Sequence, residues 1–163
     1  MTVVNIHASC VVLDKAAALF GAAPGDGVLL LSESGSGKST VALKLLAMGA
    51  TLVADDRVEL YVHEQVLWAR APVSLAGRIE ARGLGVVTLP HAANARVALA
   101  VALGPDVPRY PERETYEPPA PLAVRAKPPL LRLSAQDMAV AEKIVLAASA
   151  FANALFRDEG NPQ

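Results

Sequence analysis

The stretch VLLLSESGSGKSTVALKLLAMG, residues 28–49, contains an apolar run, a turn rich in serine and glycine, and a helical pattern. The apolar run predicts a buried strand at 27–31, and the spacing of apolar residues after the turn predicts a helix over 40–48 that ends at Gly49. A turn of this kind between a strand and a helix suits phosphate binding, because loop amides and the helix dipole both face the anion. The stretch therefore predicts an α/β domain with a phosphate-binding loop.

The loop departs at one position from the nucleotide-binding pattern G-x-x-x-x-G-K-[ST], since Ser32 stands where the first glycine is expected. In this pattern the loop amides hold the phosphates, the lysine reaches the β and γ phosphates, and the next hydroxyl binds Mg²⁺. We expect an adjusted loop that still binds nucleotide. The expected contact residues are Ser34, Gly35, Ser36, Gly37, Lys38, Ser39 and Thr40. The alternative is a turn that only joins a strand to a helix.

Composition restricts the other classes of function. The 163 residues predict a single domain, and the net charge of −1 provides no broad basic surface for nucleic acid or anionic lipid. The single cysteine excludes an internal disulfide, and the N-terminus lacks the features of a signal peptide. The apolar stretch at 144–156 is too short to cross a bilayer. We expect a cytoplasmic protein with no membrane or nucleic-acid partner.

The remaining pattern predicts more strands than helices, which favours a mixed central sheet. Strands are expected at 3–13, 51–54, 58–62, 66–69, 85–89 and 96–103, and a final helix at about 135–156. Prolines concentrate at 105–129, where we expect an irregular, exposed and mobile loop because proline lacks an amide donor.

The segment LVADDRVEL, residues 52–60, places two adjacent carboxylates at the end of an apolar strand. One carboxylate in such a pair can hold the magnesium shell while the other accepts a proton from an attacking hydroxyl. Taken alone, Asp55 and Asp56 could equally lie in a solvated turn. The phosphate-binding loop upstream favours a metal and base site.

Four segments in this order, HASC, SGSGKST, LVADDRVEL and IEARGLGVVTL, resemble the catalytic domain of HPr kinase/phosphorylase. The resemblance covers residues 5–157. It implies one HPr kinase catalytic domain over 1–163, without the family's separate N-terminal domain, and the P-loop fold shared with phosphoenolpyruvate carboxykinase. It also implies ATP and Mg²⁺ as cofactors, a serine of an HPr-type phosphocarrier protein of a phosphotransferase system as acceptor, and a hexameric assembly.

The resemblance also implies roles for single residues. Lys38 matches the phosphate-binding lysine, and Ser39 matches the metal-binding hydroxyl. Asp56 matches the acid that accepts the proton, with Asp55 as its companion on the metal side. Glu80, the acid of EARGLG, matches a second magnesium ligand.

Two further matches leave alternatives open. His7 matches the active-site histidine of the family, although a histidine bonded locally at a strand end would have the same sequence context. Arg109 resembles a catalytic arginine of the mobile loop, where it would neutralise charge on the transferring phosphoryl group. Arg113 is close enough in sequence to take that role instead.

One segment differs from the family. Where the family has V-R-P-G-R-N, which is associated with removing phosphate from phospho-HPr, this chain has LRLSAQD at 131–137. Arg132 is the only cation in this segment, and we expect Asp137 to offset it. The sequence therefore predicts a serine kinase with weak or absent phosphorylase activity. The alternatives are an ATPase or small-molecule kinase on the same fold, and a non-catalytic regulator that senses nucleotide.

Overall fold

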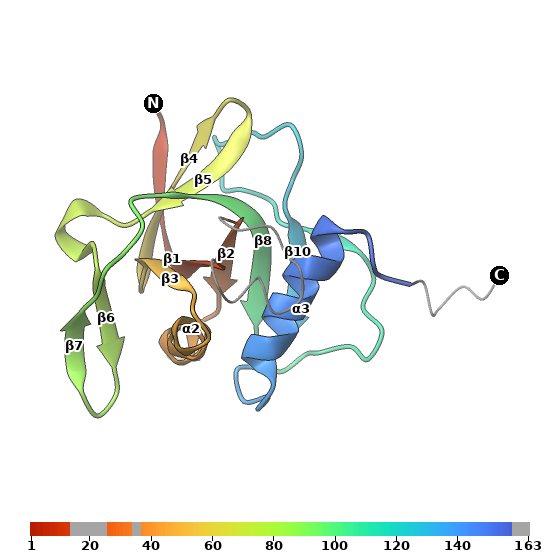
Figure 1. The fold of residues 1–163 in the computed structure, drawn as a ribbon. Helices are drawn as coiled ribbons and strands as arrows, with labels where there is room; N and C mark the ends of the chain where they lie inside the picture. Colours follow the sequence, from red (N-terminus) through yellow and green to blue (C-terminus); the bar gives the residue numbers. More distant parts are fainter. Residues whose placement is uncertain (14–25, 34–36, 158–163) are drawn as a thin grey trace.

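The computed structural model describes residues 1–13, 26–33 and 37–157, which form a mixed sheet, a separate hairpin and two helices (Figure 1). The strands of the main sheet are β1 Val3–Val12, β2 Asp26–Leu31, β3 Thr51–Ala54, β4 Arg57–His63, β5 Val66–Arg70, β8 Ala95–Leu103, β9 Glu114–Thr115 and β10 Pro129–Leu133. The hairpin consists of β6 Arg78–Ala81 and β7 Gly85–Thr88, and a short 3-10 turn, η2 Val73–Leu75, precedes it. The helices are α2 Lys38–Ala47 and α3 Val140–Ala152.

Five strands of the main sheet pair in a closed circuit, which runs from β2 through β1, β4, β5 and β8 back to β2. The pairs β2–β8 and β8–β10 are parallel, and the other pairs of this sheet are antiparallel. This arrangement confirms the predicted α/β fold with a mixed sheet. Parallel pairing of β2 with β8 places the chain ends that follow both strands at the same edge of the sheet.

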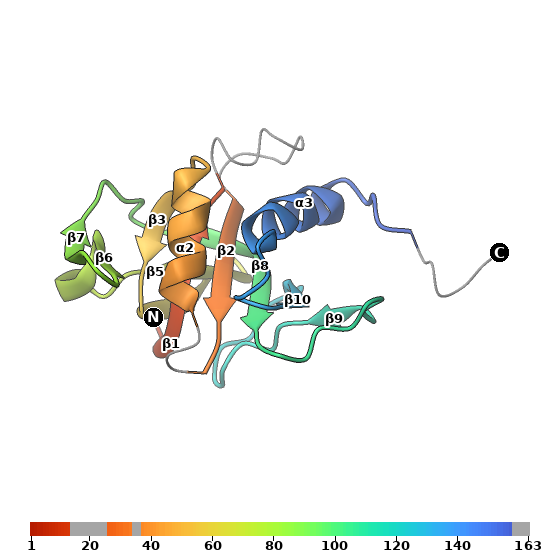
Figure 2. The ribbon, with the colours of Figure 1, turned by 90° about the horizontal axis from the view of Figure 1, so that it is seen from below.

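Two apolar clusters occupy the two faces of the sheet. Helices α2 and α3 lie together on one face (Figure 2), where they cover Val28, Leu30 and Val101. Because successive side chains of a strand point to opposite faces, Leu29 of β2 belongs to the second cluster, with Cys10 and Leu60. Side chains on both faces of β2 are therefore buried, so the strand before the predicted phosphate-binding loop is anchored in both clusters.

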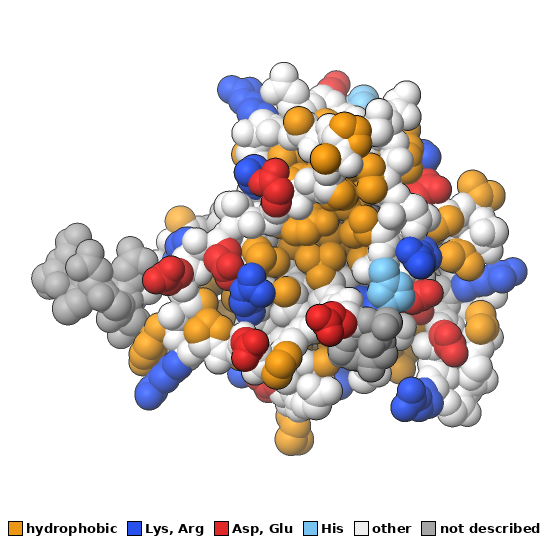
Figure 3. All heavy atoms as spheres, turned by 180° about the vertical axis from the view of Figure 1, so that it is seen from behind, with side chains coloured by type: hydrophobic (Ala, Val, Ile, Leu, Met, Phe, Trp, Pro, Cys, Tyr) orange, Lys and Arg blue, Asp and Glu red, His pale blue; other side chains and the backbone are white. Residues whose placement is uncertain are grey.

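Seen from behind relative to Figure 1, the molecule carries apolar side chains across its middle (Figure 3). Part of the proline-rich segment packs against the second cluster, in which Leu122 is buried. The prediction of an exposed, irregular loop over 105–129 is therefore wrong in part. The segment includes β9 and the first residue of β10, and an apolar residue between prolines has enough contact area to be buried.

The final helix is shorter than predicted. Local hydrogen bonds occupy the residues before it, because the Ser134 hydroxyl accepts from the Gln136 amide and the Asp137 carboxylate accepts from the Ala139 amide. At the other end Ala154 adopts a positive φ of 53°, and the Leu155 amide donates to the Ala150 carbonyl. This pattern is that of a Schellman termination, which ends the helix before residue 156.

Among the residues that the structure describes, neither helix is long and apolar enough to cross a bilayer.

Cys10 lies fully buried in β1, and this burial raises the pKa of its thiol to about 12. A thiol with so high a pKa is almost entirely protonated at neutral pH and has no role as a nucleophile.

Candidate active site

The predicted phosphate-binding loop lies in the sequence between β2, which ends at Leu31, and α2, which begins at Lys38. Gly37 precedes the helix with a φ of 91°, a conformation that favours glycine, and a Cβ at this position would lie 3.0 Å from the Cβ of Ala135. The predicted contact residues Ser34, Gly35 and Ser36 lie outside the described residues. Thr40 is exposed in the first turn of α2.

Lys38 opens α2 and is only 5% exposed. Its Nζ donates a hydrogen bond of 3.3 Å to the Oγ of Ser32, the residue that replaces the expected glycine. Burial lowers the pKa of Lys38, and the negative charges of Asp56 and Asp55 act against this shift. Burial therefore destabilises the charged ammonium group, and an anionic ligand bound beside it would stabilise that charged form.

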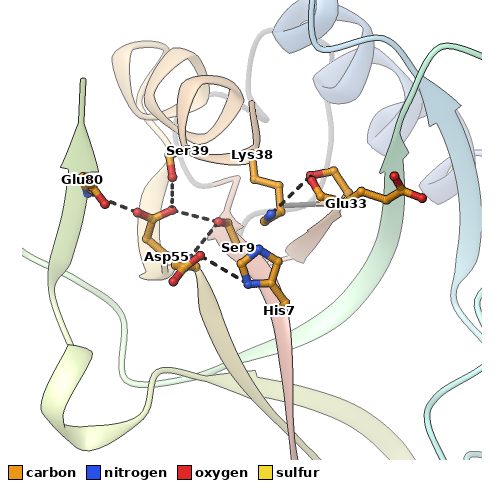
Figure 4. A network of polar contacts seen from close by, with 9 residues as sticks. His7, Ser9, Glu33, Lys38, Ser39, Asp55 and Glu80 are labelled. Atoms are coloured by element: carbon orange, nitrogen blue, oxygen red, sulfur yellow. Dashed lines mark hydrogen bonds and ion pairs between the residues drawn. The ribbon is translucent and has the colours of Figure 1, made fainter. Parts of the chain in front are cut away.

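Asp55 is the centre of a polar network that joins three elements (Figure 4). Its Oδ1 accepts hydrogen bonds from the hydroxyls of Ser39 at 2.8 Å and Ser9 at 2.9 Å. Its Oδ2 accepts from the backbone amide of Glu80 at 3.2 Å. The carboxylate is thus held by α2, β1 and β6 in a residue that is 6% exposed.

Asp56 differs from its neighbour because it forms a tight turn between β3 and β4. The Arg57 amide donates to the Asp55 carbonyl at 2.8 Å, which closes a three-residue turn around Asp56 with its φ at 68°. A three-residue turn with positive φ is the rare, strained form, and strain of this kind concentrates at functional sites. The Asp56 side chain is 64% exposed, and its Oδ1 lies 3.3 Å from Nδ1 of His7.

His7 and Ser9 lie on the same face of β1, since they are two residues apart in a strand. Ser9 donates to Asp55 and accepts from the Asp56 amide at 3.2 Å, so one buried hydroxyl positions both acids. The sequence analysis named His7 and missed Ser9. The available signal was the strand periodicity of HASC, which places both side chains toward the loop.

The donor set is suitable for a magnesium ion. Ser39 and Asp55 offer hydroxyl and carboxylate oxygens side by side, and Mg²⁺ prefers oxygen ligands while keeping several waters and substrate phosphates. Glu80, the predicted second ligand, reaches Asp55 through its backbone amide, and the residue is exposed. Within the described ranges no three His, Cys, Asp or Glu side chains cluster as a protein-only metal cage.

The two arginines considered for the proline-rich segment have different surroundings. The Arg113 guanidinium lies over the ring of Phe156 at 4.2 Å and that of Phe151 at 5.6 Å, at the end of α3. The Arg109 guanidinium lies over the ring of its neighbour Tyr110 at 5.3 Å. Arg113 therefore contacts the two aromatic rings at the end of α3. Among the described residues, the interaction found for Arg109 is the one with the neighbouring Tyr110 ring.

A cavity of about 630 Å³ lies beside the loop, with His7, Ser32 and Arg132 among its lining residues.

The prediction that Asp137 offsets the charge of Arg132 is wrong. Asp137 pairs with Lys143 of α3, and Arg132 pairs with Glu114 of β9. A larger cavity of about 1060 Å³ lies at the start of β2 and β8, at the other end of these strands from the phosphate-binding loop.

Three comparisons agree with this geometry. Residues 18–95 match the family model described as HPr Serine kinase C-terminal domain. The HPr kinase/phosphorylase of Clostridium acetobutylicum is 44% identical over 66 residues, which are 40% of this chain and 22% of that protein. That of Caldicellulosiruptor bescii is 50% identical over 68 residues, 41% of this chain and 22% of that protein. The matches thus span about a fifth of the length of these relatives.

A solved structure covers more of the chain. It is described as the Hpr(Ser) kinase/phosphatase from Coxiella burnetii, and it superposes with a TM-score of 0.70 at 23% identity over 94% of this chain and 99% of that chain. This similarity shows that the two chains share a fold. The chain is therefore similar to an HPr serine kinase C-terminal domain over residues 18–95, is similar to HPr kinase/phosphorylases over about two fifths of its length, and shares the fold of the Coxiella burnetii structure.

Proposed function

We propose that the protein transfers the γ-phosphoryl group of ATP to a serine of an HPr-type phosphocarrier protein. The observation that carries this proposal is the division of labour between Asp55, which is buried and bonded to Ser39, and Asp56, which is exposed next to it. Phosphoryl transfer needs a fixed set of groups for the phosphates and an accessible base for the incoming hydroxyl. Asp55 would serve the first need through the metal that it holds for the phosphates, and Asp56 would serve the second.

The nucleotide would be held from the α2 side. Lys38 would bind the β and γ phosphates, and Ser39 and Asp55 are the residues that would hold Mg²⁺. Bound Mg²⁺ supplies charge neutralisation on the transferring phosphoryl group. The hydrogen bond between Ser39 and Asp55 keeps both oxygens in position before ligands bind, which reduces the cost of ordering them.

The acceptor would approach from the exposed side. Asp56 would accept the proton of the serine hydroxyl as its oxygen bonds to the γ phosphorus, while ADP leaves. His7 contacts Oδ1 of the exposed Asp56 side chain, which would leave Oδ2 to meet the incoming hydroxyl. We propose that residues 1–163 act as one catalytic domain and that Glu80 stays close to the metal through its contact with Asp55.

A transfer assay tests this proposal. The protein is incubated with γ-labelled ATP, Mg²⁺ and the HPr proteins encoded in the same genome, and the label on each HPr is counted. We expect transfer that requires Mg²⁺ and is lost when the acceptor serine is replaced by alanine. ATP hydrolysis at the same rate without any HPr would instead indicate an ATPase. Binding of ATP without transfer or hydrolysis would indicate a nucleotide sensor.

A further inference from the structure

Arg132 is a cation in the wall of the cavity next to the phosphate-binding loop. It lies in β10, and Ser32 and His7 line the same cavity. A guanidinium in this position is a potential phosphate ligand, because its planar fork matches two phosphate oxygens. Whether the cavity accepts a second anion therefore depends on what else Arg132 contacts.

Glu114 occupies one edge of that fork with a bidentate contact and places a negative charge directly against the guanidinium. The Arg132 Nε donates to Oε2 at 2.8 Å, and Nη2 donates to Oε1 at 3.1 Å. The pairing of β9 with β10 places the two residues on neighbouring strands. The hydrogen bond from Arg132 lowers the pKa of Glu114, so the carboxylate stays ionised well below neutral pH. Arg132 is consequently neutralised where it faces the cavity.

The other charges around the cavity do not compensate for this loss. Glu33 and Asp106 line the same space, and Asp106 also acts on Arg132 electrostatically. Lys143 pairs with Asp137. Lys38 reaches Ser32 in the wall of this cavity, but it is the ammonium group proposed to hold the phosphates of the nucleotide. A phosphate dianion that entered the cavity would meet carboxylates and an arginine already bound to one.

We propose that Glu114 is a specificity-determining residue, which binds Arg132 and thereby keeps a second phosphate group out of the cavity. This inference rests on the proposed function, because it assigns the cavity to the acceptor side of the same reaction. A neutral serine hydroxyl can enter such a space, whereas inorganic phosphate and phosphoserine are repelled. Glu114 would therefore favour the forward transfer over its phosphorolytic reversal.

The reversal shows why the second anion matters. In that reaction an oxygen of inorganic phosphate bonds to the phosphorus of phosphoserine, the bond from phosphorus to the serine oxygen breaks, and diphosphate leaves. The serine oxygen takes up a proton, which Asp56 in its protonated form would supply. Two phosphate groups must lie next to each other, and an arginine free to bind one of them would reduce their repulsion.

The test compares phosphate binding by the whole chain and its Glu114→Gln variant, with ADP and Mg²⁺ present to fill the nucleotide site. Inorganic phosphate is titrated and binding is followed by ³¹P NMR. We expect Glu114→Gln to bind phosphate at least about fivefold more tightly, which is the effect of one unit charge close by in water. Glu112→Gln, the same change at an exposed position of the same segment, should bind like the wild type. Adding Arg132→Gln to Glu114→Gln should abolish the gain.

Each result has a definite meaning. Equal affinity in the wild type and Glu114→Gln would overturn the proposal, as would tight binding by the wild type that Arg132→Gln removes. Because phosphate binding is measured without any acceptor protein, it is independent of the transfer assay. Failure of transfer to every HPr would overturn the proposed function and leave the phosphate result to be judged separately.

Discussion

Asp55 and Asp56 are neighbours in the chain but have opposite environments. Asp55 is 6% exposed and its carboxylate accepts three hydrogen bonds, whereas the Asp56 side chain is 64% exposed and contacts His7. The three-residue turn around Asp56 produces the difference, because it kinks the chain sharply between β3 and β4, which both run antiparallel to β1. The comparison teaches that two neighbouring acids can be given different environments at a single peptide bond: one is buried and fixed by hydrogen bonds, on the side proposed for the nucleotide, and the other is accessible, on the side proposed for the acceptor.

The largest expected effect lies on the rigid side. Lys38→Met should reduce phosphoryl transfer about 10²–10³-fold, the usual cost of removing one charge-stabilising donor. Transfer to an HPr-type protein measures it, with Lys44→Met in the last turn of the same helix as the control. A Lys38→Met variant that transfers at more than half the wild-type rate would show that the phosphates are held elsewhere.

The same variant has a second readout in stability. The pKa of Lys38 is lowered in the folded state, which means that burial of the charged ammonium group lowers the free energy of unfolding at neutral pH. Lys38→Met removes this charge and should therefore unfold at a higher urea concentration than the wild type. As pH rises through the lowered pKa toward 10.5, the folded protein holds fewer protons than the unfolded one, and the wild type gains stability. The difference in unfolding free energy between Lys38→Met and the wild type, measured by urea unfolding, should therefore become smaller between pH 7 and 10.

On the accessible side, Asp56→Asn should slow transfer about 10²-fold and leave binding of ATP with Mg²⁺ nearly unchanged, because asparagine cannot accept the proton. Asp55→Asn is the matched comparison and should weaken the binding of Mg²⁺, so that transfer needs a higher Mg²⁺ concentration. Calorimetric titration and transfer rates at saturating metal separate the two. If Asp56→Asn loses magnesium binding and keeps its rate, the two acids have exchanged roles.

A smaller effect is expected where the two sides meet. Ser9→Ala removes a donor to Asp55 and the acceptor of the Asp56 amide, so it should lower the free energy of unfolding by about 1–2 kcal/mol. Urea unfolding measures it, and Ser74→Ala at an exposed position serves as the control. An unchanged unfolding free energy would mean that Ser9 does not couple the two acids.

The smallest effect is expected at the loop position that lacks the usual glycine. Ser32→Gly removes only one partner of the Lys38 ammonium, so nucleotide affinity should change less than about tenfold, or ~1.4 kcal/mol. Calorimetric titration with ATP and Mg²⁺ measures this change. A wild type that fails to bind, together with recovery in Ser32→Gly, would show that the serine disables the loop.

Local pattern was sufficient for much of the fold. The predicted strand at 51–54 agrees with β3 at both ends, and the predicted strands at 3–13 and 66–69 agree with β1 and β5 within one residue. These segments are apolar and end at turn residues, so their signal is strong. β6, β9 and β10 were missed because two are very short or charged and the third begins at a proline, and pairing with partners distant in sequence stabilises them.

By itself the sequence determined the α/β class, the strand β2 and helix α2 on either side of the serine- and glycine-rich segment, and the pair of acids after β3, because each depends on residues that are close together in the chain. Only the tertiary structure decided what these residues contact. It brought Ser9 to Asp55 across 46 positions and assigned Glu114, not Asp137, to Arg132. The physical reason is that a carboxylate or guanidinium bonds to whichever partner the packing of strands and helices places within reach, and neither composition nor periodicity specifies that partner.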